Sequence, residues 1–413
     1  MMWFLLAAAL AFSGTSGDDA RLAWWREARV GLFIHWGPSS LSGQEIGWSR
    51  GASESIEEYD RLYERFDPAA FDADAWIRLA KQAGCRYVVP VSKHHDGFCM
   101  WPSDTTDYDI ASTPFRRDII GELAAASRKH GLHFGVYYSI LDWWHPNWPT
   151  DSPGGSKPKT DADLERYVSY MKKHLDELMT RYGVELLWFD GQWEPPWNPD
   201  RAADLLAYCM AKSPKLVINN RVGPAKPGTE PGYLGDYLTP EQHIGAFDTV
   251  RPWETCMTLG EQWSYRAGDR YKSEDRLIEI LSQVVCGDGN FLINVGPTPE
   301  GRMPDEQQRL LRAMGAWLRV HGEAVYAARG GPVPPGDFGG TTHTKDAIYV
   351  HIRRTGRGVV DLPIAAPGPG AVWLHTGERA YWVEREGGIR LSIPDLSDGP
   401  AVCVAKLPLP AAR

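Results

Sequence analysis

Short apolar runs alternate with longer amphipathic segments from about Ala23 to Ala328. The runs are rich in valine, isoleucine, leucine and aromatic residues, which is typical of strands buried on both faces. The intervening segments space apolar residues three and four positions apart, as in Leu164, Val168 and Met171, which is typical of helices. The predicted strands are Val30–Trp36, Tyr87–Ser92, Phe134–Ser139, Glu185–Asp190, Leu216–Arg221 and Phe291–Val295, with a weaker run at Trp253–Met257.

Repeated strand–helix units predict a parallel sheet with helices packed on it. A closed barrel is the commonest form of such a sheet in a unit of this length. We therefore predict an α/β fold, a (β/α)8-like barrel of the TIM type, over residues 18–328. No eighth strand is visible in the pattern, so an irregular barrel is compatible with it.

The pattern changes after the Gly/Pro-rich stretch at residues 329–340. Beyond it, short apolar runs are separated by Gly/Pro turns, and helical periodicity is lacking. This favours a small antiparallel β-sandwich over residues 329–413. Its predicted strands are Ile348–Ile352, Ala371–His375, Ile389–Ile393 and Val402–Leu407.

Charge and the N-terminus narrow the class of protein. The 413 residues carry a formal net charge of −9 and no block of Lys or Arg, which argues against nucleic acid or an anionic membrane surface as partner. The apolar run Met1–Phe12 is too short to span a bilayer, so residues 1–17 are interpreted as a signal peptide and the protein as exported. No later stretch predicts a membrane span. The six cysteines show no framework spacing, and buried free thiols are expected.

Polar and aromatic residues end five consecutive predicted strands. Residues at the C-terminal ends of parallel strands line a common site, so we expect these clusters to meet. Asp190 follows a buried strand, and carboxylates are costly to bury without a purpose or partner. Asp190 is therefore the first catalytic candidate. The clusters are His35–Gly37, Lys93–Phe98, Tyr137–Ser139, Asp190–Gly191 and Asn219–Arg221.

The sequence gives less support to a metal site, a serine or cysteine nucleophile, or a phosphate site. Adjacent His94, His95 and Asp96 would point to opposite faces of a strand, and spacings such as HxH or HExxH are lacking, so we predict no metal. A serine nucleophile lacks its GxSxG elbow, and Cys99 has no evident histidine partner. The glycines at 287–289 follow a predicted helix rather than opening one, which does not favour a phosphate site.

A carboxylate pair among histidines and tryptophans is the equipment of glycoside hydrolysis. The chain has 18 tryptophans, whose flat faces suit packing against sugar rings. Asp190 fits the nucleophile. Glu241, on an expected loop over the barrel mouth, is the first choice for the acid/base because loops supply rim residues. Glu254, on the weak strand, is the second choice, although it could instead orient other groups or pair with Arg251.

Six motifs in this order resemble the α-L-fucosidases of glycoside hydrolase family 29. The resemblance runs from about Trp24 to Gly301. It implies a barrel followed by a β-sandwich, and an exo-acting retaining hydrolase that removes terminal α-L-fucose through a covalent fucosyl-aspartate. The motifs are Gly31–Gly37, Lys93–Phe98, Phe134–Ser139, Trp188–Gly191, Trp253–Met257 and Asn290–Pro297.

The resemblance also implies roles for single residues. Asp190 would be the nucleophile with Arg221 beside it, Trp263 would pack near the methyl group of fucose, and Trp48 matches a pocket tryptophan. Many members have adjacent Glu and Trp where this chain has Glu45-Ile46-Gly47-Trp48, so the role of Glu45 in sugar binding stays open. The residues expected to bind fucose hydroxyls are His35, His94, His95 and Tyr137.

The expected partners are fucosylated oligosaccharides or glycoconjugates, with no cofactor. The oligomeric state and the fucosyl linkage are not readable from the sequence. The alternatives are a catalytically silent fucose- or galactose-binding protein of the same fold, a metal-dependent hydrolase, and a hydrolase of a related sugar such as galactose. Trp263 favours fucose over galactose, because the methyl group needs an apolar wall.

Overall fold

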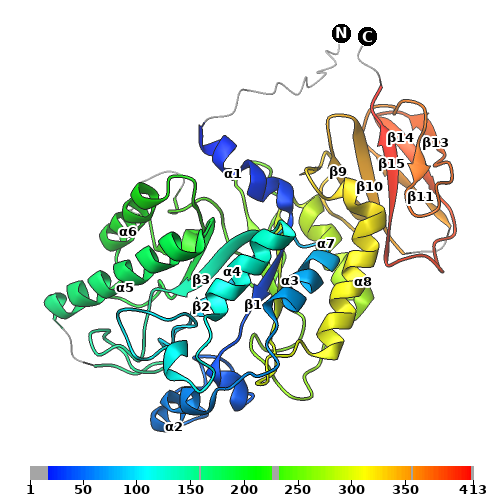
Figure 1. Ribbon diagram of the computed structural model, residues 1–413. Helices are drawn as coiled ribbons and strands as arrows, with labels where there is room; N and C mark the ends of the chain where they lie inside the picture. The colour runs from blue at the N-terminus through cyan, green and yellow to red at the C-terminus, as the bar shows by residue number, and fades with distance from the viewer. Residues whose placement is uncertain (1–16, 158–159, 226–231, 355–356, 411–413) are drawn as a thin grey trace.

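The computed structural model describes residues 17–157, 160–225, 232–354 and 357–410. Helices surround a central curled sheet, and smaller antiparallel sheets lie beside it near the C-terminus (Figure 1). The predicted signal peptide lies, except for Gly17, outside the described residues. Within the described part of the chain, no helix is long and apolar enough to cross a membrane.

The central sheet has seven parallel strands in the order β5-β4-β3-β2-β1-β7-β6. All predicted strands are present, and the weak run is confirmed as β6, which begins at Glu254 rather than Trp253. The strands are β1 (Val30–Ile34), β2 (Tyr87–Lys93), β3 (His133–Ser139), β4 (Leu186–Asp190), β5 (Val217–Ile218), β6 (Glu254–Thr258) and β7 (Asn290–Val295).

An irregular segment, Tyr237–Glu241, fills the gap between β5 and β6; we call it the closing segment. Parallel bridges join it to Asn219 on one side and to Trp253 and Cys256 on the other. Towards β6 the backbone hydrogen bonds continue along the segment, whereas towards β5 they are confined to its beginning, where the amide of Asn220 donates to Tyr237 O. The sheet is therefore a (β/α)8-like barrel with one irregular member.

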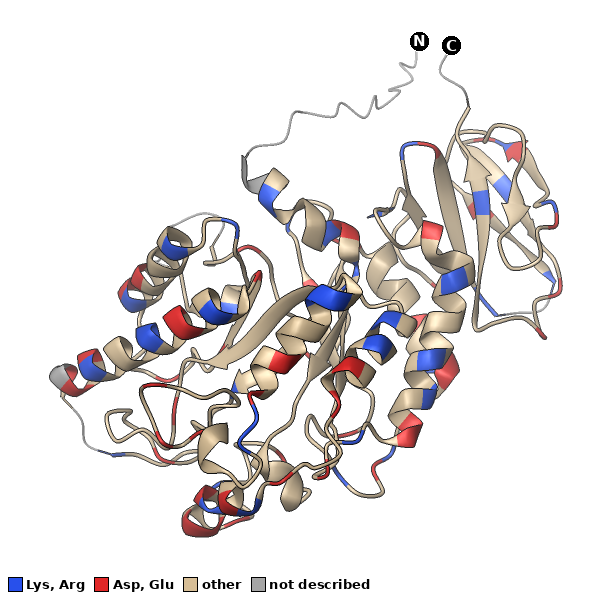
Figure 2. Cartoon of the chain, in the orientation of Figure 1, with Lys and Arg blue, Asp and Glu red and all other residues tan. Residues whose placement is uncertain are grey.

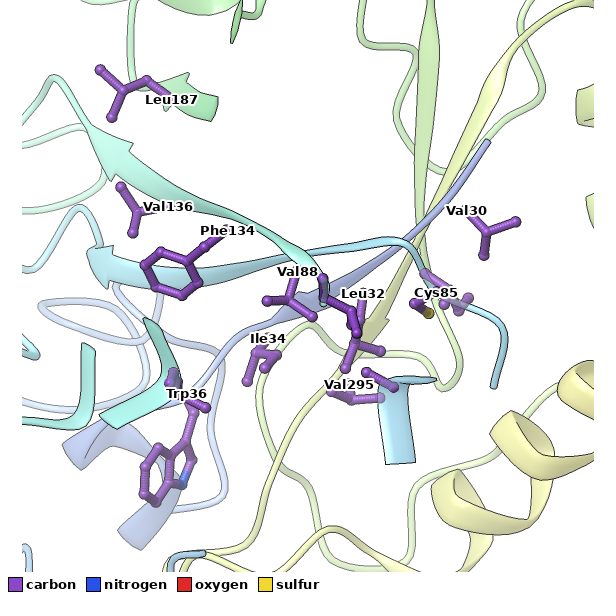
Figure 3. Close-up of a cluster of buried hydrophobic side chains, with 14 of the residues drawn as sticks. Val30, Leu32, Ile34, Trp36, Cys85, Val88, Phe134, Val136, Leu187 and Val295 are labelled. Carbon is purple, nitrogen blue, oxygen red and sulfur yellow. The ribbon is translucent and has the colours of Figure 1, made fainter. Parts of the chain in front are cut away.

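Alternate residues along the strands face the helices or the barrel interior. Val30, Leu32 and Ile34 of β1 belong to the outer core, together with Val88 and Val136 (Figure 3). The intervening residues fill the interior, which explains why these strands are apolar throughout. The interior set includes Phe33, Val89, Val91, Tyr137, Trp188 and Leu292.

The helices present apolar residues to the outer core and charged residues to solvent, whereas the barrel strands are nearly free of charge (Figure 2). Side chains of Asp72, Asp118, Thr160, Asn198 and Ser273 cap their helices. The helices are α1 (Gly17–Ala28), α2 (Ile56–Asp60), α3 (Ala73–Gln82), α4 (Ile119–His130), α5 (Asp161–Tyr182), α6 (Pro199–Lys212), α7 (Glu274–Cys286) and α8 (Asp305–His321). Short 3-10 helices are η1 (Pro38–Leu41), η2 (Leu62–Arg65), η3 (Ile110–Ser112), η4 (Asn220–Val222) and η5 (Gly322–Ala324).

Two antiparallel sheets follow and pack on each other through a core of their own, which confirms the predicted sandwich architecture. The five-stranded sheet also contacts α7, and the Trp317 indole of α8 donates to Val402 O at 2.8 Å. One sheet, in the order β12-β15-β10-β9-β8, contains β8 (Arg329–Gly330), β9 (Gly339–His343), β10 (Ala347–Arg353), β12 (Val372–Trp373) and β15 (Val402–Pro408). The other, in the order β11-β14-β13, contains β11 (Gly358–Leu362), β13 (Trp382–Arg385) and β14 (Gly388–Ile393).

All six cysteines are buried free thiols, which confirms that prediction. Among the described residues, no group of three or more His, Cys, Asp or Glu side chains is arranged to hold a metal ion.

Candidate active site

The polar ends of the barrel strands converge at one rim. Parallel strands point the same way, so their C-terminal residues meet at one end of the barrel. Asp190 is the last residue of β4, Tyr137 lies near the end of β3, and Arg221 lies in η4 after β5. The other candidates at this rim are His35 after β1, His94 and His95 after β2, and Glu241 at the end of the closing segment.

Asp190 points into this group of residues and is nearly buried, with 8% of its surface exposed. Its Oδ2 accepts a hydrogen bond from Tyr137 Oη at 2.9 Å and lies 3.6 Å from His95 Nε2. Its Oδ1 accepts from Arg221 Nη1 at 2.9 Å. Gly191, with φ of 80°, turns the chain immediately afterwards, because a left-handed conformation is readily adopted only by glycine. The carboxylate is thus fixed at a strand end beside the groups predicted to bind the sugar.

Arg221 joins the two candidate catalytic carboxylates. Its Nη1 bonds Asp190 and its Nη2 donates to Glu241 Oε2 at 2.7 Å, while Nε donates to Thr239 Oγ1 at 2.9 Å. The guanidinium also lies over the ring of Trp188, 4.8 Å from its centroid. Burial opposes the charge, but the Asp190 and Glu241 carboxylates raise the pKa of Arg221, so it stays cationic.

His35 and His95 present one ring nitrogen each towards the site. His35 Nδ1 lies 2.6 Å from Asn294 Oδ1, which can only accept, so Nδ1 carries the proton and Nε2 is left as an acceptor. His95 Nδ1 lies 2.7 Å from Ser139 Oγ, whose own proton goes to Leu141 O, so the same tautomer is assigned. Burial lowers the pKa of His35 to about 4 and that of His95 well below its usual value. Both imidazoles are therefore neutral hydrogen-bonding groups.

His94 packs flat on Tyr137, with ring centroids 5.2 Å apart and planes 8° apart. Burial, followed by the neighbouring histidines, lowers its pKa well below the usual value. Its buried Nδ1 has no hydrogen-bond partner among the described residues. A Cβ on Gly47 would lie 2.6 Å from this nitrogen, and Gly47 has φ of 69°. The glycine between Glu45 and Trp48 is thus required both by the turn and by the close approach of His94.

The structure resolves the position of Glu45. Its carboxylate accepts hydrogen bonds from the backbone amides of Trp263 at 2.9 Å and Ser264 at 3.1 Å, and from Ser264 Oγ at 3.1 Å. Burial raises the pKa of Glu45. These bonds hold the loop that carries Trp263, whose ring centroid lies 4.9 Å from that of His35. The carboxylate of Glu45 therefore positions a neighbour of the site, and a direct role in sugar binding stays a prediction.

Trp48 lies at the outer part of the site. Its ring is edge-on to that of His95, with centroids 5.5 Å apart, and the residue is 42% exposed. Its neighbours are consistent with the predicted pocket tryptophan.

Glu254, the second candidate for the acid/base, lies at the opposite end of the barrel. It is the first residue of β6 and pairs with Asn290, the first residue of β7. It is completely buried and accepts hydrogen bonds from Trp188 Nε1 at 3.0 Å, Trp25 Nε1 at 3.3 Å and the Tyr87 hydroxyl. Burial raises its pKa to about 7. The sequence placed Glu254 on the weak strand, and the structure puts it at the start of β6, away from the rim that carries Asp190.

Of the two alternatives for Glu254, pairing with Arg251 is wrong, because Arg251 bonds Asp248 at 2.6 Å, whereas Glu254 does orient other groups. Glu241 is the acid that the fold brings to Asp190. It ends the irregular closing segment at the rim where Asp190 ends β4, which agrees with the predicted loop over the barrel mouth.

Several residues of the site were not singled out from the sequence. Trp188, two positions before Asp190, shares its face of β4 and stacks on Tyr137 with centroids 5.7 Å apart. Asn294 and Ser139 fix the tautomers of His35 and His95. Period-two alternation back from Asp190 could have found Trp188, whereas Asn294 depends on pairing between β1 and β7.

A parallel barrel with two carboxylates, an arginine and neutral histidines at its C-terminal rim defines a glycoside hydrolase of the barrel class. The α-L-fucosidase family matches residues 13–323. The chain belongs to this family.

Relatives and solved structures agree over most of the chain. A tissue α-L-fucosidase of Bos taurus is 34% identical over 337 residues, covering 74% of this chain and 69% of that protein. An α-L-fucosidase of Branchiostoma floridae is 30% identical over 92% of this chain and 90% of its own length. The structure of α-L-fucosidase isoenzyme 1 from Paenibacillus thiaminolyticus is 31% identical, with a TM-score of 0.86 over 96% of this chain and all (100%) of that one. A family 29 enzyme from Bacteroides thetaiotaomicron, trapped as a covalent intermediate with 2-fluoro-fucosyl fluoride, is 30% identical, with a TM-score of 0.85 over 94% of this chain and 96% of that one.

Proposed function

We propose that this chain is an exo-acting, retaining α-L-fucosidase in which Asp190 is the nucleophile and Glu241 the acid/base. The observation that carries the assignment is the single guanidinium of Arg221, which bonds both carboxylates at 2.9 Å and 2.7 Å. Retaining enzymes use two carboxyl groups about 5–5.5 Å apart, so both must lie in one small site. Arg221 holds Asp190 and Glu241 in one such site. Family membership supports the same chemistry.

The first step forms a covalent ester. Asp190 Oδ attacks the anomeric carbon of fucose while protonated Glu241 gives its proton to the glycosidic oxygen, and the bond to the leaving group breaks. Arg221 and Tyr137 donate hydrogen bonds to Asp190 and hold its carboxylate in place for the attack. In the second step Glu241 takes a proton from water, the water oxygen attacks the same carbon, and Asp190 leaves as a carboxylate. Two inversions give net retention.

The neutral imidazoles and the aromatic rings account for recognition of the sugar. His35 and His95 offer acceptor nitrogens that hydroxyl groups of fucose can satisfy. The unpartnered Nδ1 of His94 lies against Gly47 instead, so His94 would meet the sugar through the rest of its ring. Trp263 supplies an apolar wall for the methyl group. We therefore expect poorer turnover of the corresponding galactoside, whose additional hydroxyl would face that wall.

The substrates are proposed to be fucosylated oligosaccharides or glycoconjugates outside the cytoplasm. The apolar run Met1–Phe12, within the predicted signal peptide at residues 1–17, supports export.

The decisive experiment replaces the nucleophile. Asp190→Gly should abolish hydrolysis of an aryl α-L-fucoside, and added azide should restore turnover and yield a fucosyl azide. Glu185→Gln, at an exposed carboxylate just before β4, is the control and should retain activity. Undiminished hydrolysis by Asp190→Gly would refute the assignment. Fucose binding by a wild-type protein without turnover would instead indicate the silent binding protein.

A further inference from the structure

Trp193 has no role in the fucose site described above, although it lies close to it. It follows β4 by three residues and is 47% exposed. Its ring is nearly parallel to that of Trp48, with centroids 6.0 Å apart and planes 14° apart. Both rings are edge-on to His95, at 5.3 Å for Trp193 and 5.5 Å for Trp48. One imidazole therefore separates this pair from Asp190.

These two rings are unusual for this chain. Most of its tryptophans are buried, and Trp48 and Trp193 are the tryptophans among the exposed large apolar side chains of the described ranges. Exposed apolar rings that adjoin one another and a catalytic site indicate a binding surface rather than isolated surface residues.

The loop that carries Trp193 is held in place by its neighbour. The Glu194 carboxylate accepts hydrogen bonds from Trp148 Nε1 at 2.6 Å, Trp143 Nε1 at 3.1 Å and Thr150 Oγ1 at 2.7 Å. Trp143 and Trp148 are fully buried, so they are rigid anchors. The loop after β4 is thus tied to the loop after β3, and Trp193 is kept at the surface.

We propose that Trp193, together with the outer face of Trp48, is a stacking platform for the pyranose ring of the glycan to which fucose is attached. The inference rests on the proposed function, because it assigns the leaving-group side of the same site. Sugar rings offer C–H faces that pack on indole, and a rigid exposed ring makes this contact at little entropic cost. The fucose site recognises hydroxyls through His35, His94 and His95, whereas the platform would recognise the flat face of the next sugar.

The test separates the two halves of the substrate. α-L-Fucosyl fluoride carries fucose without any sugar leaving group, whereas fucosylated lactose carries both. Trp193→Ala should lower kcat/KM for fucosylated lactose about tenfold, through KM, while kcat/KM for the fluoride changes by about twofold or less. Trp193→Phe should recover most of the loss. Tyr381→Ala, at a 63% exposed ring in the C-terminal region, is the matched control and should change neither value.

A second measurement uses the covalent intermediate. With fucosyl fluoride as donor and lactose as acceptor, a lactose hydroxyl attacks the anomeric carbon, Glu241 takes its proton, and Asp190 leaves. Trp193→Ala should lower the ratio of fucosyl-lactose to free fucose several-fold. Equal losses on both substrates, or no loss on either, would overturn the platform. No turnover of the fluoride by the wild-type protein would instead remove the proposed function.

Discussion

The two ends of the barrel use the same residue type for opposite purposes. At the C-terminal rim, the Glu241 side chain is 40% exposed and paired with Arg221 beside Asp190. At the opposite end, where the strands begin, Glu254 is completely buried and accepts hydrogen bonds from the neutral groups of Trp25, Tyr87 and Trp188. We call these four residues the floor of the barrel. In barrel enzymes the C-terminal rim carries the chemistry and the opposite end contributes to stability.

The two glutamates show that a raised pKa does not by itself identify a catalytic acid. A raised pKa is the usual property of a catalytic general acid, and Glu254, with its pKa raised to about 7 by burial, has that property. However, its carboxylate bonds groups of the floor, so no substrate at the rim can take its proton. Geometry therefore ranks above the pKa in choosing between the two glutamates.

The largest expected effect tests the rim against the floor directly. Glu241→Gln should lower kcat for a fucosyl disaccharide by roughly 10²–10⁴-fold, because the leaving sugar then receives no proton, and should spare aryl fucosides with good leaving groups. Glu254→Gln, the matched change at the floor, should leave this leaving-group dependence as in the wild type. Steady-state kinetics on both substrates measure it. The reverse pattern would exchange the two assignments.

The floor of the barrel is expected to contribute to the stability of the fold. Glu254→Ala removes the common acceptor of two indoles and a phenol, and leaves a cavity, so the free energy of unfolding should fall by roughly 4 kcal/mol. Urea denaturation followed by circular dichroism measures this. Glu185→Ala, at an exposed carboxylate, is the control and should change stability little. A loss at Glu254 no greater than that at Glu185 would contradict a structural role for the floor.

The pH dependence of stability should also come partly from the floor. The pKa of Glu254 is raised from 4.5 to about 7 in the folded state, so the native protein holds a proton that the unfolded chain releases. The resulting stability is complete below about pH 4.5 and is lost as the pH rises through about 7, by up to about 3 kcal/mol. Glu254→Gln cannot titrate, so its free energy of unfolding should fall less than that of the wild type between about pH 5 and about pH 8. Equal slopes would show that the acid is ionised at both values.

A smaller effect is expected from the close contact between Gly47 and His94 at the rim. Gly47→Ala must adopt φ of 69° and brings a Cβ to 2.6 Å from His94 Nδ1, whereas Gly43→Ala adopts φ of 67° with no atom within 4 Å. Both should lose about 1 kcal/mol of stability through backbone strain. Only Gly47→Ala should also lower kcat/KM, because His94 must move. Equal kinetics in the two variants would show that the close approach has no functional weight.

The sequence predicted the parts of the molecule that depend on local pattern. The apolar runs located β1 to β7 because strands buried on both faces have no polar alternation. The strand-end rule brought Asp190, His35 and Tyr137 together correctly. The closing segment was not predicted as the eighth member of the barrel, because Thr239, Pro240 and Glu241 interrupt any apolar run.

The remaining errors depend on position within an element and on contacts distant in sequence. Whether Glu254 begins or ends a strand decides to which end of the barrel it belongs, and boundaries are the weakest part of pattern reasoning. Glu45 bonds backbone amides 218 and 219 residues away, which no local spacing encodes. Four C-terminal strands were missed. The residues of β11 and β13 are mostly exposed, and β8 and β9 are rich in Gly and Thr rather than large apolar residues.

The junction between β5 and the closing segment forms a seam in the barrel. Among the described residues, backbone hydrogen bonds cross it only near Asp236 and Tyr237. Further along, Arg221 spans it by bonding Thr239 and Glu241 while also bonding Asp190. Parting of the two edges would draw the proton donor away from the nucleophile while every other strand pair stays intact. Under gentle heating, inactivation should therefore precede melting of the sheet, and a bound inhibitor that occupies both halves of the centre should delay it.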